Sequence, residues 1–246
     1  VIDAARPACR PADRPLLALI DRWLGGEPPN TVEGIGARQL RLRAIARFQQ
    51  LTSPAAAKAV EDTAFYRHGR LLSRSEVGAD PGQFLLSVED FHARADRRAR
   101  LFPHALLATA THDHKRGEDL RARLAVLGEV AAEWAQSVAR WYADNASLRS
   151  SAGAAGADDP APDGADEYML YQMIVGAWPP LLAADDCAGI AALRERLLGW
   201  QLKALREAKR HTSWVEPDLA YEQSCADFLG AVLDPARSSH FLAAVR

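Results

Sequence analysis

The sequence predicts a mostly α-helical fold that includes a parallel βα unit. Long segments place apolar residues at helical spacing, whereas one short continuous apolar run at 105–110 ends abruptly in polar residues. With 48% hydrophobic and 25% charged residues, the 246-residue chain has the composition of a globular protein. Its length is enough for one large domain or two small ones.

Two helices are expected near the N-terminus. The first covers the apolar residues of 16–24 and should end at the glycines and prolines of 25–29. The second covers 40–51 and should stop at Pro54, because proline lacks the backbone donor that a helix interior needs. A third should begin after Ser87, which is followed by acidic residues and is therefore expected to cap it.

The apolar run at 105–110 is the expected strand of the βα unit. It ends in Thr111-His112-Asp113, and a helix pattern opens at Gly117 and continues to Leu127. Catalytic groups of such units sit at the C-terminal end of the strand, which places His112, Asp113 and Lys115 at the rim of an active site. A buried helix segment would produce a similar apolar run.

The C-terminal half is expected to be helical after a linker. Residues 146–164 are mostly Ala, Gly, Ser, Pro and Asp, which is loop composition. Four amphipathic helices should follow, at 166–178, 186–209, 218–233 and 240–245.

Composition excludes several classes of function. A net charge of -2 does not indicate a nucleic-acid partner, and no apolar run reaches the ~20 residues of a membrane span. The three cysteines, Cys9, Cys187 and Cys225, are scattered, so a disulfide framework or zinc site is not expected and a reducing cytoplasm fits.

Lysine is rare in this chain. The 30 basic residues include only four lysines, Lys58, Lys115, Lys203 and Lys209. Since arginine replaces lysine almost everywhere, each remaining lysine is either a chance surface residue or a position that needs a compact ammonium group.

The segment Lys58 to Arg67 is the first candidate site. It packs a cation, the acids Glu61 and Asp62, two aromatic residues and a second cation into ten positions. Sugars expose apolar ring faces rimmed by hydroxyls, so their sites combine aromatic and charged side chains. The same residues would also suit the start of a helix, with acids near its positive end.

The segment His112-Asp113-His114-Lys115 is the second candidate. Imidazole and carboxylate both suit divalent metals, which makes a His-Asp metal-dependent phosphohydrolase one interpretation, with His92 and His104 as further ligands. Their spacing matches no closed zinc pattern, so polar loop residues after a strand are another interpretation.

Taken in order, several segments resemble the maltooligosyltrehalose synthases of the alpha-amylase clan. The resemblance covers most of the chain and weakens in the first forty residues, the linker and the last few. The matching segments are Phe48–Thr52, Lys58–Arg67, Glu76–Gly78, Thr109–Arg123, Asp166–Trp178 and Arg206–Tyr221.

This resemblance implies a fragment of a (β/α)8 barrel with large helical insertions and with strands near 55–60 and 105–110. It divides the chain into a helical insertion at 1–52, a partial barrel at 53–128 and a helical insertion domain at 129–246. The implied enzyme is a cytoplasmic isomerase of trehalose biosynthesis. It converts the reducing-end α-1,4 linkage of a maltooligosaccharide to an α,α-1,1 linkage, without metal or cofactor, and its oligomeric state is not predicted.

The resemblance also implies the roles of individual residues. Asp113 would be the third catalytic carboxylate of the clan, and His112 would hydrogen-bond the same sugar. Lys58 and Lys115 would contact the reducing-end glucose, which must be retained and turned over. Among the remaining charged residues, the predicted substrate-binding set also contains Glu61, Asp62 and Arg116.

Some features depart from the family pattern. Ala59 and Ala79 replace common glycines, and His114 stands where a small hydroxyl residue is usual. The nucleophile and the acid/base carboxylate, which a retaining mechanism holds ~5 Å apart, would lie on earlier strands that nothing here resembles. The isolated chain is therefore expected to be inactive. The alternative outside enzymology is a helical carbohydrate-binding or interaction module without chemistry.

Overall fold

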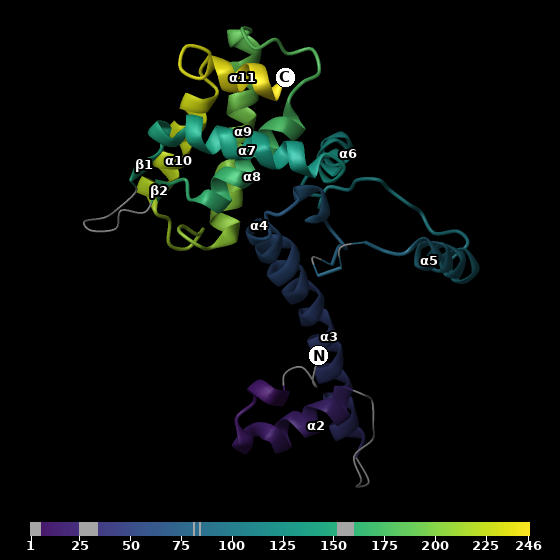
Figure 1. Ribbon diagram of the computed structural model, residues 1–246. Helices are drawn as coiled ribbons and strands as arrows, with labels where there is room; N and C mark the ends of the chain where they lie inside the picture. The colour runs from purple at the N-terminus through teal and green to yellow at the C-terminus, as the bar shows by residue number, and fades with distance from the viewer. Residues whose placement is uncertain (1–5, 25–33, 81, 84, 152–159) are drawn as a thin grey trace. The chain divides into compact units, whose positions relative to one another are not determined.

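The computed structural model describes residues 6–24, 34–80, 82–83, 85–151 and 160–246, which are mostly helical. The chain forms two compact units, Val1–Lys58 and Ala59–Arg246, and Figure 1 follows the chain through both. None of the described helices is both long and apolar enough to cross a membrane.

Two helices make up most of the first unit. Short 3-10 turns at Arg6–Ala8 and Pro11–Asp13 precede α2 (Arg14–Leu24), which confirms the first predicted helix. The glycines and prolines expected to end it lie outside the described residues. The last helix of this unit is α3 (Ile35–Ala59), and it runs through Pro54 instead of stopping there.

The strand expected near 55–60 is therefore wrong. Residues 55–59 are the last turns of α3, and Val60 opens a π-helical turn. Ala55, Ala56 and Ala57 explain the difference, since alanine has the highest helix propensity and the helix resumes at once after the single donor that Pro54 removes.

The second unit is a helical assembly with one short hairpin. Its elements in chain order are the π turn η3 (Val60–Ala64), α4 (Phe65–Arg67), η4 (Leu72–Arg74), α5 (Val88–Leu101), α6 (Glu118–Ala125), η5 (Val126–Gly128), α7 (Ala131–Asp144), η6 (Ala146–Leu148), β1 (Ser150–Ser151), β2 (Pro160–Ala161), α8 (Gly164–Ala177), α9 (Cys187–Ala208), α10 (Leu219–Val232) and α11 (Ser239–Val245). The predicted helices after residue 87 are confirmed, and α7 was not predicted separately.

Helix α8 lies at the centre of this unit. It is apolar nearly all round and packs against α6 and α9. Helix α9 also packs against α10, and Figure 1 shows α8, α9 and α10 together. Its core neighbours include Trp141 of α7 and Phe241 of α11, whose rings meet edge to face at 5.1 Å. The core therefore draws on every long helix after residue 117.

Side-chain caps mark the beginnings of four helices in this unit, α5, α8, α9 and α10. The Ser87 hydroxyl accepts from the Asp90 N–H at 3.0 Å, which confirms the predicted cap of α5. Asp163, Asp186 and Asp218 do the same for α8, α9 and α10. Each cap satisfies backbone donors that a helix leaves free in its first turn.

The described part of the predicted linker contains a short pair of strands. Strands β1 and β2 pair antiparallel, with Ser150 opposite Ala161, and residues 152–159 between them lie outside the described residues. Within the described residues this pair is the only sheet.

The strand expected at 105–110 is also wrong. These residues, all described, form irregular chain, and the side chains of Leu106 and Leu107 are 99% and 71% exposed. A strand must exchange backbone hydrogen bonds with a neighbour, and no neighbouring strand lies within the described part of the chain to provide them.

Candidate functional site

The acidic residues of the first candidate segment lie on the π turn η3. The Phe65 N–H donates to the Val60 carbonyl, five residues back, so the turn holds one residue more than an α-helical turn. Such π turns are rare and often occur at functional sites, because the extra residue redirects side chains. Here the turn contains Glu61 and Asp62, both partly buried.

Lys115 pairs with this turn. Its Nζ donates to Oδ1 of Asp62 at 2.7 Å, and the two side chains are only 10% and 16% exposed. A pair this shielded is screened by water less than a surface pair and holds the lysine in one place. The structure thus brings together two residues that the sequence assigned to separate candidate segments.

Glu76 holds the backbone of the same loop. One carboxylate oxygen accepts the N–H of Lys115 at 2.7 Å, and the other accepts the N–H of Arg116 at 3.1 Å. The first oxygen also accepts the N–H of Val77 at 3.0 Å, and Glu76 is only 4% exposed. Glu76 lies in a segment that resembles the family but is not among the predicted site residues, because nothing in a lone glutamate indicates which distant backbone it will bind.

Arg116 is buried instead of open to a sugar. It is 5% exposed, and its Nη1 donates to the Ser75 carbonyl at 3.0 Å. Burial lowers its pKa, while the nearby Tyr66 and Glu76 oppose that shift. Burial also raises the pKa of Tyr66 to about 12, so Tyr66 stays neutral beside the guanidinium. Substrate contact by Arg116 stays a prediction.

His112 and Asp113 face solvent. Their side chains are 93% and 66% exposed, and His112 Nε2 lies 3.5 Å from Asp113 Oδ1. The next residue, His114, turns back, and its Nδ1 lies 2.9 Å from both the N–H and the hydroxyl of Thr111. The pair therefore projects from a small turn that ends just before the anchored Lys115.

Lys58 is the last residue of the first unit and lies exposed in the final turn of α3. Glu61 follows three residues later, and its Oε1 accepts the Gly78 N–H at 3.2 Å. The predicted roles of both residues at a sugar stay predictions.

Helix α9 packs against η3 and against α4, which follows it. Arg67 donates to the carbonyl of Ala208 at 2.6 Å and to that of Lys209 at 3.2 Å, at the C-terminal end of the helix. The Nζ of Lys209 lies 3.4 Å from the Thr63 hydroxyl. Lys209 is the second lysine to reach η3, a contact that sequence reasoning missed because helix-end lysines commonly serve the helix alone.

The proposed metal ligands do not gather. Among the described residues, the only group of three or more acidic, histidine or cysteine side chains with ligand atoms within 4.8 Å of one another is Asp163, Asp166 and His211. It excludes His112 and Asp113. The metal-dependent phosphohydrolase interpretation thus finds no ligand set around the His-Asp pair in the described chain.

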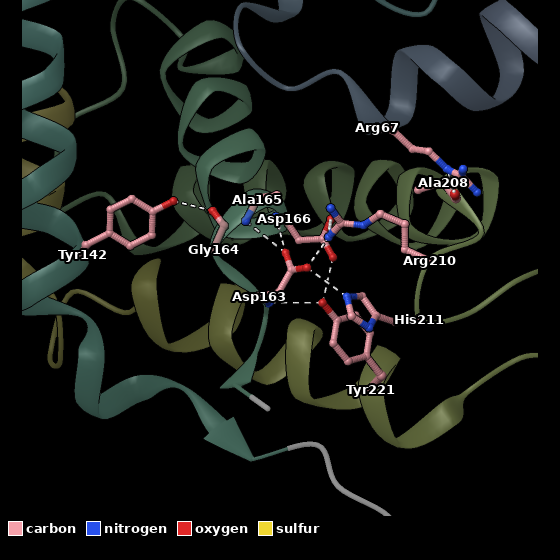
Figure 2. Close-up of polar contacts among 10 residues, drawn as sticks. All are labelled: Arg67, Tyr142, Asp163, Gly164, Ala165, Asp166, Ala208, Arg210, His211 and Tyr221. Atoms are coloured by element: carbon pink, nitrogen blue, oxygen red, sulfur yellow. Dashed lines mark hydrogen bonds and ion pairs between the residues drawn. The ribbon is translucent and has the colours of Figure 1, made fainter. Parts of the chain in front are cut away.

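Figure 2 shows what neutralises the Asp163 group. Arg210 reaches both acids, hydrogen-bonding Asp163 and lying 3.3 Å from Asp166 Oδ1. His211 Nε2 lies 2.8 Å from Asp163 Oδ2, and the Tyr221 hydroxyl donates to Asp166 at 2.7 Å. The Arg210 guanidinium contacts both carboxylates, so this network joins the start of α8 and Tyr221 of α10 to the residues that follow α9.

The pKa values of Asp163 and Asp166 are shifted in opposite directions. Burial raises the pKa of Asp166, and the Asp163 charge adds to the rise. Burial also acts to raise the pKa of Asp163, but hydrogen bonds from Arg210, the Asp166 N–H and His211 outweigh it and lower that pKa. At neutral pH Asp163 is therefore the firmly ionised partner of Arg210.

Known proteins resemble this chain over long stretches. A Mycobacterium tuberculosis protein named "Putative maltooligosyl trehalose synthase" is 43% identical over 188 residues, which cover 76% of this chain and 22% of the relative. The chain is related to the maltooligosyltrehalose synthases. No family model matches it.

Solved maltooligosyltrehalose synthases share its fold. The Arthrobacter ramosus enzyme superposes with a TM-score of 0.74 at 31% identity over 99% of this chain and 27% of its own length. A hypothetical maltooligosyl trehalose synthase of Sulfolobus tokodaii superposes with a TM-score of 0.67 at 29% identity, covering 85% of this chain and 27% of its own. The chain thus spans only about a quarter of these synthases.

Proposed function

We propose that this chain forms part of an isomerase that converts the reducing-end α-1,4 linkage of a maltooligosaccharide to an α,α-1,1 linkage. The observation that carries the proposal is the ion pair that fixes Lys115 against Asp62. Lys115 lies two residues after the exposed Asp113. An ammonium held in one place and an exposed carboxylate two residues away in the chain are groups that can bind sugar hydroxyls. The relatedness to maltooligosyltrehalose synthases supports the same activity.

Lys115 and Asp113 have distinct tasks in this mechanism. An ammonium has three protons, and Asp62 takes one, which leaves two for hydroxyls of the reducing-end glucose. Asp113 accepts hydrogen bonds from the neighbouring sugar and favours the oxocarbenium-like transition state. His112, 3.5 Å from Asp113, orients that carboxylate or binds the same sugar.

The complete reaction needs two further carboxylates from other segments. A nucleophile attacks the anomeric carbon and the α-1,4 bond breaks, while an acid protonates the departing O4 of the terminal glucose. That glucose stays bound and turns over. Its own anomeric hydroxyl then loses a proton to the same acid/base group, attacks the glycosyl-enzyme and releases the nucleophile. No water is consumed, so the reaction is an isomerisation.

The exposed apolar run supports a place for this chain within a barrel. Leu106 and Leu107 immediately precede the site, and their side chains are almost bare. Burying such residues is favourable by roughly 1.5–3 kcal/mol each. We infer that other segments of the full-length enzyme cover these side chains and so hold the neighbouring Asp113 in place.

Two proteins test the proposal. The full-length enzyme that contains this chain is incubated with maltopentaose, and proton NMR follows the loss of reducing ends and the new α,α-1,1 anomeric signal. We expect that signal from the full-length enzyme and none from the 246-residue chain. A full-length enzyme that leaves the reducing ends intact contradicts the proposal, and product from the chain alone contradicts its dependence on other carboxylates.

One observation favours a second candidate, a carbohydrate-binding module without chemistry. A groove of about 730 Å³ lies beside α7, and its lining includes Trp134, Tyr142, Tyr168, Arg70 and Arg74. Aromatic rings beside cationic side chains can stack on and hydrogen-bond a sugar. Calorimetric titration of the chain with maltopentaose separates the candidates, since binding that Trp134→Ala removes would favour the module.

A further inference from the structure

We propose that Glu76 is a positioning residue that sets where the Lys115 ammonium stands, and through it which product the enzyme forms. This inference rests on the proposed function. Glu76 lies 39 residues before Lys115 in the chain and binds its backbone, so the glutamate is not itself in the predicted sugar-binding set.

Glu76 binds the backbone of the loop that contains Lys115 and Arg116. Both oxygens of the Glu76 carboxylate are used by the consecutive N–H groups of Lys115 and Arg116, at 2.7 and 3.1 Å. Consecutive backbone donors that converge on one carboxylate form an anion-binding concavity, and charged acceptors make the stronger hydrogen bonds. With Glu76 only 4% exposed, water does not compete for these donors.

Glu76 is itself held in a tight turn that is bonded to η3. Its carbonyl accepts the Ala79 N–H at 2.9 Å, closing a tight turn in which Gly78 adopts a positive φ of 77°. Glu61 of η3 accepts the Gly78 N–H at 3.2 Å. The turn that presents Glu76 is thus fastened to the same π turn that contains Asp62.

Together these contacts close a ring. Glu61 binds Gly78, Glu76 binds the Lys115 backbone, and the Lys115 ammonium returns to Asp62, the neighbour of Glu61. Each contact fixes a different part of the loop, so the backbone and the tip of Lys115 are located independently. Loss of Glu76 releases the backbone and leaves the ammonium held only at its tip.

The functional consequence concerns the fate of the terminal glucose. If Lys115 holds that glucose while it turns, a displaced ammonium lets the sugar leave, and water then takes its place at the glycosyl-enzyme. The product shifts from the α,α-1,1 linkage to free glucose plus a shortened glucan. A displacement of about 1 Å can cost on the order of 100-fold in rate.

The test measures product partition in the full-length enzyme that contains this chain. Glu76→Gln keeps the size of the side chain but puts an amide donor against a backbone N–H. We expect the ratio of glucose released to α,α-1,1 linkage formed to rise about tenfold, within the range that misplacement allows. Glu222→Gln is the matched control, since Glu222 is another buried carboxylate, bonded to Arg206. It should leave the ratio unchanged.

A double variant identifies the route. If Glu76 acts through Lys115, then Glu76→Gln added to Lys115→Met should change the ratio no further than Lys115→Met alone. Independent, multiplying effects overturn the inference, as does an unchanged ratio in Glu76→Gln. If Glu76→Gln does not fold, Gly78→Ala replaces it. Gly78 has a positive φ that alanine adopts only with strain, so this variant distorts the same turn without altering a charge. A normal ratio in folded Gly78→Ala then overturns the inference.

Failure of the proposed function looks different. A wild-type enzyme that forms no α,α-1,1 linkage contradicts the proposed reaction. A wild-type enzyme that forms it, with a Glu76 variant of unchanged ratio, contradicts only the role of Glu76.

Discussion

The Lys115 ammonium lies 2.7 Å from the Asp62 carboxylate, although 53 residues separate them in the chain. This contact joins the loop that follows the exposed apolar run to the π turn at the end of α3. It converts two charged segments, each ambiguous alone, into one site.

The first prediction concerns the stability of this pair. Asp62→Asn and Lys115→Met should each lower the free energy of unfolding of the chain by about 1–3 kcal/mol, because each leaves a partly buried charge without its partner. The double variant should lose less than the sum of the two, since both singles remove the same contact. Urea denaturation measures all three, and strictly additive losses would show that the contact contributes nothing.

The second prediction concerns catalysis by Asp113. In the full-length enzyme, Asp113→Asn should reduce turnover by at least about 100-fold, in line with the loss of a charge that stabilises a transition state. Folding should be intact, because the Asp113 side chain is 66% exposed. Asp119→Asn is the control, an exposed acid in the first turn of α6. Steady-state rates and circular dichroism are compared, and near-normal turnover removes Asp113 from the catalytic set.

The third prediction concerns pH and the network of Figure 2. The pKa of Asp163 is lowered in the folded chain, so its stabilising effect is present above the unfolded value, near ~4, and fades as the pH falls through the folded value. Asp163→Asn should therefore unfold more easily than wild type at pH 6, by about 1 kcal/mol, because it loses the charge-assisted bonds to Arg210 and His211.

The measurement is thermal unfolding of both proteins between pH 6 and pH 3. The difference between wild type and Asp163→Asn should narrow as the medium becomes more acidic. A gap that stays constant or widens would contradict the assigned direction of the pKa shift.

The fourth prediction concerns the packing of α6 on α8. A Cβ added at Gly176 would lie 3.0 Å from Leu120 and 3.1 Å from the fully buried Leu124. Gly176→Ala should therefore destabilise the chain by about 1–3 kcal/mol through overpacking. Gly199→Ala is the matched control: Gly199 is a helical glycine of α9 with nothing within 4 Å, and its substitution should stabilise by about 0.5–1 kcal/mol. Equal effects in urea denaturation would contradict the tight contact.

Local pattern was enough to predict most helices. Ser87 capped its helix as expected, and the helices after the linker lie within a few residues of their predicted positions. These features depend on side chains within one or two turns of each other, which sequence spacing reports directly. Both strand predictions were wrong: alanines continue α3 through 55–59, and the run at 105–110 has no partner strand in the described residues.

The site was predictable in its residues but not in its connections. Asp62 and Lys115 were selected from charge and from the family resemblance, yet neither the π turn at Val60–Ala64 nor the grip of Glu76 has a local signature. Both depend on contacts between segments far apart in the chain.

Helix α9 packs against η3 and α4, whereas the side chains of His112 and Asp113 project into solvent. Arg67 hydrogen-bonds the C-terminal end of α9, a helix with many buried residues, so local opening of residues 61–66 is expected to cost more than opening of the exposed segment 105–113. Amide hydrogens of residues 61–66 should then exchange slowly, with the core, while those of 105–113 exchange quickly. If the proposed function holds, the conformational entropy lost on binding a glucan falls mainly on the His112-Asp113 turn, and segments of the full-length enzyme that pre-order this turn raise affinity without a new contact to sugar.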